Sequence, residues 1–175
     1  MTASAADRGL KAETLDKIRA IAALYPRSAS ALLPALYLAQ KELGHVGGDV
    51  YRQISPLLGL SPTQIEDAAT YYVMFHKKPA GKYPLEVCTN LTCALKGARA
   101  TVDALCSKLR VKPGEVSGDG LFSVREVECL GACENAPVVQ VEALNHPKIT
   151  AEKVDDLIAD FKSSGGQKTR EEEPR

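Results

Sequence analysis

The chain has no net charge, no long apolar run and no Cys-x-x-Cys motif. Lysine and arginine together number 22, as do aspartate and glutamate, so no overall field steers the chain towards nucleic acid or anionic lipid. No apolar run approaches the ~18 residues that a membrane-spanning helix needs, and residues 1–13 lack the features of a targeting segment. These absences predict a cytoplasmic chain that binds no nucleic acid and does not insert into the membrane.

The composition is that of an ordinary globular protein. Hydrophobic residues make up 45% of the 175 residues and charged residues 25%, which is enough apolar side chain to build a core. This length suits one domain, or a small domain with a helical appendage. No G-x-G-x-x-G turn is present, so the sequence predicts no dinucleotide site in this chain.

Four of the five cysteines form two close pairs. The pairs are Cys88-x4-Cys93 and Cys129-x3-Cys133, and 35 residues separate them. Four thiolates on two short loops can surround one small inorganic core, so the pattern predicts an iron–sulfur cluster. The fifth cysteine, Cys106, stands apart from both pairs.

Other uses of cysteine fit the pattern less well. Disulfides suit small secreted chains, whereas here the cysteine count is odd and no signal segment is visible. Structural zinc sites and thiol redox pairs favour C-x2-C spacing, which neither pair has. A Rieske centre needs two histidines as ligands, but His45, His76 and His146 all lie outside the two loops, so all-cysteine ligation is favoured.

Residues 13–75 have helical periodicity throughout. Apolar stripes over 15–25, 31–43, 50–57 and 65–72 predict four helices. Gly44 and Gly59 follow the second and third of them, as expected of helix ends. Ser61 and Gln64 form a capping box with proline at the first helical position, which predicts the start of the fourth helix.

The pattern changes after the basic, Pro- and Gly-containing segment 76–82, which we interpret as a solvated linker. Strands are predicted over 83–88, 121–127 and 138–141. The apolar stripe over 95–109 predicts a helix, and Thr150 is expected to cap a last helix. Cys106 lies within the helical stripe, so packing is its expected role. The predicted organisation is a helical domain over 1–80, a second domain over 81–162 and a disordered tail over 163–175.

Both loops are suited to hold a cluster. Cys88 and Cys129 come at the carboxyl ends of predicted strands, so the loops should converge on one edge of the sheet. Cys93 is expected at the start of a helix, whose free N–H groups favour thiolate. Gly131 and Ala132 are small enough for backbone N–H groups to approach sulfur. Such donors are needed because a 2Fe-2S core with four thiolates carries a charge of about −2.

Several segments around the cysteines resemble the sequence of a known family. The run 119–123, the loop 129–133 and Ala136-Pro137 are similar to the signature of the thioredoxin-like 2Fe-2S subunit of respiratory complex I. Segments 71–75, 81–83 and 87–93 resemble the same family. The resemblance implies an α+β fold in which an N-terminal four-helix bundle precedes a thioredoxin-like domain, with one 2Fe-2S cluster on Cys88, Cys93, Cys129 and Cys133.

The resemblance also implies a partner. In that family the small subunit docks on a flavoprotein that binds FMN and oxidises NADH, and it exchanges single electrons with the flavin. This chain would then have no catalytic residue of its own and would lie at the inner side of the membrane through the complex. Related subunits serve NAD-linked hydrogenases and formate dehydrogenases. A free thioredoxin-like ferredoxin and a zinc-stabilised interaction module are the remaining alternatives.

Aromatic residues at the end of the helical region are candidates for the partner surface. Tyr71, Tyr72 and Phe75 cluster there, and large aromatic side chains are common at interfaces. The alternative is that they pack the junction between the two domains.

Overall fold

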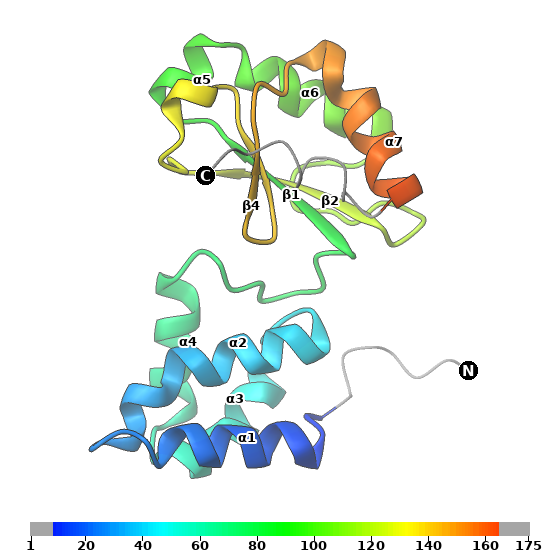
Figure 1. The fold of residues 1–175 in the computed structure, drawn as a ribbon. Coiled ribbons are helices and arrows are strands. Elements are labelled where there is room, and N and C mark those ends of the chain that lie inside the picture. The colour runs from blue at the N-terminus through cyan, green and yellow to red at the C-terminus, as the bar shows by residue number, and fades with distance from the viewer. Residues whose placement is uncertain (1–8, 165–175) are drawn as a thin grey trace. The chain divides into compact units, whose positions relative to one another are not determined.

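The computed structural model describes residues 9–164, and the chain divides into two compact units between Pro79 and Ala80 (Figure 1). Each unit has a hydrophobic core of its own. The first unit contains helices, and the second combines helices with a sheet.

The first unit is built from four helices, as the periodicity predicts. They are α1 (Ala12–Ala22), α2 (Leu32–Leu43), α3 (Gly48–Leu58) and α4 (Pro62–Tyr71), and a 3-10 turn over Ser28–Ala31 leads into α2. The Ser61 hydroxyl accepts from Gln64 N–H and the Gln64 side chain accepts from Ser61 N–H, so the capping box is confirmed. Gly44 ends α2 in the left-handed conformation at φ 76°, where glycine carries no steric cost.

The aromatic residues after α4 differ in exposure. Phe75 is 2% exposed and packs edge-to-face on Tyr37, with ring centroids 5.1 Å apart. The prediction that Phe75 contributes to a partner surface is therefore wrong, because its side chain belongs to the core of the helical unit. Tyr72 is half-buried against the same core, whereas Tyr71 is 79% exposed.

The second unit is a four-stranded sheet with helices on one face (Figure 1). Its elements are β1 (Tyr83–Cys88), α5 (Leu91–Leu95), α6 (Ala98–Leu109), β2 (Phe122–Val127), β3 (Val139–Val141), β4 (Leu144–His146) and α7 (Val154–Ser164), with 3-10 turns at Cys133–Asn135 and Ala151–Lys153. The strand order is β2-β1-β3-β4. β1 pairs parallel with β2, while β3 pairs antiparallel with both β1 and β4.

The core of the sheet unit lies between the sheet and helices α6 and α7. Leu85 and Val87 of β1, Phe122 and Val124 of β2, and Leu105 of α6 are all fully buried in it. Alternate residues of a strand point to opposite faces. Glu86 therefore lies on the other face of β1, where it forms an ion pair with Arg125 of β2.

Four features of this unit differ from the sequence prediction. Strand β4 was not predicted, and the apolar stripe over 95–109 is divided at Gly97, which has φ 92°. The Thr150 side chain makes no capping bond to the backbone, and it precedes a 3-10 turn rather than an α-helix. Helix α7 extends to Ser164, so the predicted tail begins inside a helix, and its residues 165–175 lie outside the described residues.

Over the described range 9–164, no helix has the length and apolar character needed to cross a membrane.

Candidate metal centre

The first cysteine pair lies where β1 leads into α5. Cys88 is the last residue of β1, and Cys93 lies in the first turn of α5. The expectation that Cys93 lies near a helix start holds, although this helix ends at Leu95. Asn90 caps α5 by accepting Leu91 N–H at 2.8 Å. Cys88 and Cys93 are each 3% exposed, so this pair is part of the core of the sheet unit.

The second pair lies on the loop that follows β2. β2 ends at Val127, Cys129 comes two residues later, and Cys133 opens a 3-10 turn. Both cysteines are exposed. Gly131 takes the left-handed conformation at φ 75°, and its N–H donates to Cys129 Sγ at 3.4 Å. This is the kind of close approach of backbone to sulfur that the small residues of the loop predict.

The parallel pairing of β1 and β2 brings the two loops to the same edge of the sheet. Cys88 pairs with Val127 in the ladder, and Thr89 N–H donates to the Val127 carbonyl at 3.1 Å. Burial raises the pKa of the Cys93 thiol, and the thiols of Cys88 and Cys133 raise it further, against a hydrogen bond from the Val138 backbone that lowers it. Thiols from both loops therefore act on one another at this edge.

This donor set fits a 2Fe-2S core. In the described part of the chain, no three His, Cys, Asp or Glu side chains are gathered closely enough to hold one metal ion. A 2Fe-2S core does not require this, because each of its two irons takes two thiolates. Cys88 with Cys93 and Cys129 with Cys133 supply two such pairs, and Gly131 and Val138 supply N–H donors to sulfur.

Apolar side chains surround the thiols unequally. Leu130, Ala132 and Ala136 are half-buried against the core of the sheet unit, and the cis-linked Pro137 is buried beside them. On α5, by contrast, Leu91 is 71% exposed and Leu95 is 79% exposed. The edge that carries the second cysteine pair is therefore open, and two unburied leucines lie on the helix of the first pair.

Cys106 is not part of this arrangement. It lies on α6, partly buried against the core of the sheet unit. Burial raises the pKa of its thiol, and the nearby carboxylates of Asp103 and Glu126 raise it further. A protonated thiol packed on apolar neighbours agrees with the predicted packing role.

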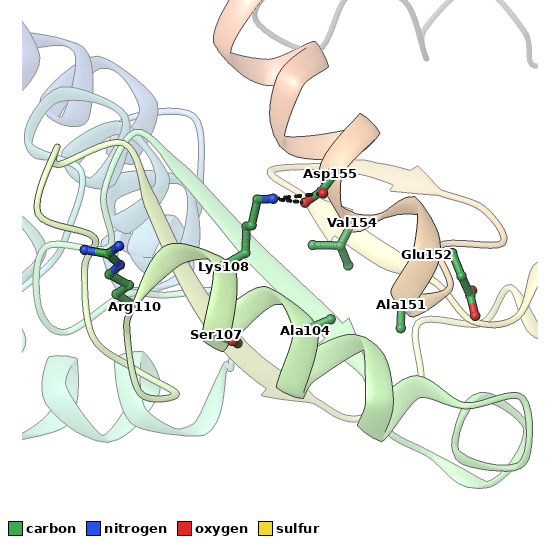
Figure 2. A pocket seen from close by; sticks show the side chains of 8 residues that line it. All are labelled: Ala104, Ser107, Lys108, Arg110, Ala151, Glu152, Val154 and Asp155. Carbon is green, nitrogen blue, oxygen red and sulfur yellow. Dashed lines mark hydrogen bonds and ion pairs between the residues drawn. The ribbon is translucent and has the colours of Figure 1, made fainter.

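A surface cavity of about 470 Å³ opens elsewhere in the sheet unit, between the end of α6 and the start of α7 (Figure 2). An ion pair between Lys108 and Asp155, 2.7 Å long, crosses it. Arg110 and Glu152 add one further charge of each sign to its lining. None of the lining residues is a cysteine or histidine, so the cavity is not part of the metal centre.

Comparison with known proteins agrees with this geometry. Residues 18–162 match the family model for thioredoxin-like 2Fe-2S ferredoxins. The chain belongs to this family. The cofactor of this chain is therefore a 2Fe-2S cluster, and its two cysteine pairs lie at the sheet edge described above.

Two similar relatives are subunits of NADH-quinone oxidoreductases. The chain is 40% identical over 149 residues to an NADH-quinone oxidoreductase subunit of Rhizobium meliloti, a match that covers 85% of this chain and 89% of that protein. It is 38% identical over 135 residues to NADH-quinone oxidoreductase subunit 2 of Thermus thermophilus, covering 77% of this chain and 75% of that one.

A solved structure shares the fold. An NAD+-reducing NiFe-hydrogenase in the H2-reduced state matches with a TM-score of 0.67 and 24% identity. The match covers 78% of this chain and 23% of the hydrogenase chain. At 24% identity, this similarity shows only that the two chains share a fold.

Two kinds of residue at the site are not predicted from the sequence. The exposure of Leu91 and Leu95 was not foreseen, since apolar spacing alone placed Leu95 on a buried helical stripe. Asn90 and Glu128 were not singled out either, although Asn90 Nδ2 donates to Glu128 Oε2 at 3.2 Å between the loops. The available signal was an asparagine just before a helix, which is typical of an N-cap.

Gly131→Ala tests the backbone geometry of the second loop. An alanine at φ 75° should cost about 1 kcal/mol, although a Cβ there meets nothing within 4 Å. We expect the cluster absorption of the variant to be lost on heating at a midpoint about 4 °C lower.

Gly118→Ala is the matched control. A Cβ at Gly118 also meets nothing within 4 Å, and its φ is not positive. This variant should leave the midpoint unchanged or raise it slightly, because alanine restricts the unfolded chain. Equal midpoints for the two variants would contradict a role for the left-handed turn.

Proposed function

We propose that this chain binds one 2Fe-2S cluster through Cys88, Cys93, Cys129 and Cys133 and acts as a one-electron carrier in the NADH-oxidising part of an NADH-quinone oxidoreductase. The observation that carries the proposal is that the two cysteine pairs lie where two neighbouring parallel strands end, in a member of a 2Fe-2S family. The similarity to two NADH-quinone oxidoreductase subunits supports the choice of assembly. When bound, the cluster takes up and releases one electron at a time.

The proposed partner is a flavoprotein subunit that binds FMN and oxidises NADH. This chain has no G-x-G-x-x-G turn, so hydride chemistry is assigned to the partner and no residue here is given a catalytic role. Leu91 and Leu95 are exposed on the helix that carries Cys93, which supports docking of the flavoprotein at this edge. Through this assembly, the chain would lie on the cytoplasmic side, at the periphery of the membrane.

The alternative assemblies differ in the subunits that would co-purify with this chain. A subunit of an NAD-linked hydrogenase or formate dehydrogenase would co-purify with the metal-bearing subunit of that enzyme. A free ferredoxin would purify alone. Affinity capture of the native chain, followed by identification of its flavoprotein and its quinone-reducing subunits, tests the proposed assembly directly.

The metal content of the purified protein tests the proposed cofactor. Protein purified without oxygen should be reddish-brown and contain about two irons and two sulfides per chain. Dithionite should produce the paramagnetic signal of a one-electron-reduced cluster. Stoichiometric zinc without sulfide, under conditions that preserve clusters, would contradict the proposal.

Substitution of single cysteines tests the ligand set. Serine in place of Cys88, Cys93, Cys129 or Cys133 should perturb or abolish the cluster spectrum, because an oxygen ligand poorly replaces a soft thiolate. Cys106→Ala is the control and should keep full iron content, since Cys106 packs on α6. Iron loss in Cys106→Ala, together with a wild-type spectrum in one of the loop variants, would overturn the assignment.

Leu95→Ser tests docking at the cluster edge. Leu95 is 79% exposed, so serine should hardly change folding but should weaken binding to the purified FMN- and NADH-binding subunit about tenfold if Leu95 anchors the interface. Leu24→Ser is the matched control, because Leu24 is 80% exposed in the helical unit. Equal affinities of both variants in a direct binding assay would place the docking surface elsewhere.

A further inference from the structure

A side-chain bridge joins the two cysteine loops just beyond the end of the strand ladder. The last backbone contact is from Thr89 N–H to the Val127 carbonyl, at 3.1 Å. One residue further along each segment, Asn90 Nδ2 donates to Glu128 Oε2 at 3.2 Å. Glu128 immediately precedes Cys129, so the bridge connects the start of the second loop to the first.

The Asn90 amide is engaged at both of its ends. Its Oδ1 accepts Leu91 N–H at 2.8 Å and so caps α5, the helix that carries Cys93. Because a backbone N–H can only donate, the amide must turn its oxygen towards Leu91. The amino group is then left to face the Glu128 carboxylate. One side chain therefore orients both the helix of one cysteine pair and the residue before the other pair.

The second loop has more need of such a bridge than the first. Cys88 and Cys93 are buried in the core of the sheet unit, whereas Cys129 and Cys133 are exposed. The inorganic core that joins them is rigid, so the distance between the two thiolate pairs must match its size. The loop is anchored on one side by Leu130 and Ala132, which pack against the core, and the contact from Asn90 ties its first residue to the other loop.

We propose that Asn90 is a positioning residue, which acts through Glu128 to hold the Cys129–Cys133 loop at the distance from Cys88 and Cys93 that the 2Fe-2S core requires. This inference rests on the ligand set given under the proposed function. Asn90 touches no thiol in this role, because it acts on the second loop through the carboxylate of Glu128.

Reversing the polarity of the bridge is the sharpest test. Asn90→Asp keeps an oxygen for Leu91 N–H and so preserves the helix cap, but it removes the donor to Glu128 and sets two carboxylates against each other. Iron release to a chelator should become about fivefold faster than in the wild-type protein. Adding Glu128→Gln supplies an amide donor from the opposite side, which restores the bridge. Release from this double variant should return to within about twofold of the wild-type rate.

Glu134→Gln is the matched control for the rescue. Glu134 is an exposed carboxylate next to Cys133, just as Glu128 is next to Cys129, but it accepts its hydrogen bond from the neighbouring Asn135. Combined with Asn90→Asp, it should leave iron release about fivefold faster than wild type, because it cannot donate across the loops.

The reduction potential gives a second readout. Glu128→Gln alone keeps an acceptor for Asn90 while it removes a negative charge beside the second cysteine pair. It should therefore raise the midpoint potential without accelerating iron release, since a negative charge near the cluster opposes the added electron.

Three results would overturn the proposal. They are a wild-type release rate in Asn90→Asp, a failure of Glu128→Gln to slow the release from Asn90→Asp, and an equal rescue by Glu134→Gln. A wild-type protein that binds no iron would instead overturn the proposed function, and the positioning role with it. The two failures are therefore distinguishable in one set of measurements.

Discussion

The parallel pairing of β1 with β2 is the constraint on which the site depends. It sets Cys88 opposite Val127 and so brings together two cysteine pairs that lie 35 residues apart in the sequence. The hydrophobic core enforces this register. Leu85 and Val87 are fully buried under the helices, and a slip of one residue would turn them to the opposite face of the sheet. The same slip would carry Cys88 away from the second loop. Burial of the apolar side chains of β1 therefore fixes the position of the Cys88 sulfur relative to the second loop.

The two cysteine pairs differ in their exposure to water, since Cys88 and Cys93 are buried whereas Cys129 and Cys133 are exposed. Cys93 of the buried pair is costly to ionise, since burial raises the pKa of its thiol. A cluster held by this thiol would have to displace its proton on binding. Once bound, that pair is shielded from water by the core. The exposed pair is easier for a redox partner to approach, and the N–H of Gly131 partly replaces water as a donor to Cys129. With the proposed ligand set, the inner pair would favour retention of the cluster, while the outer pair would favour exchange of electrons.

Much of this could be predicted from local sequence signals, and the failures have physical causes. The four helices, the Ser61 capping box and strand β1 follow from apolar periodicity and capping residues. Strand β4 has only three residues, too few for alternation to show, and the turn before it uses Glu142 at φ 56° rather than an Asn-Gly pair. Leu95 continues the stripe of α6 in sequence, but Gly97 breaks the helix and leaves Leu95 exposed. Phe75 was misjudged because aromatic composition does not distinguish a core residue from an interface residue.

Docking at the α5 edge would couple binding to the redox state. Covering Leu91 and Leu95 buries apolar surface, which favours association. A partner that also covers the exposed Cys129 and Cys133 would remove water from them, which would make the addition of negative charge to a bound cluster more costly. A partner that binds the oxidised form more tightly must, by linkage, lower the reduction potential of the cluster by the same free energy.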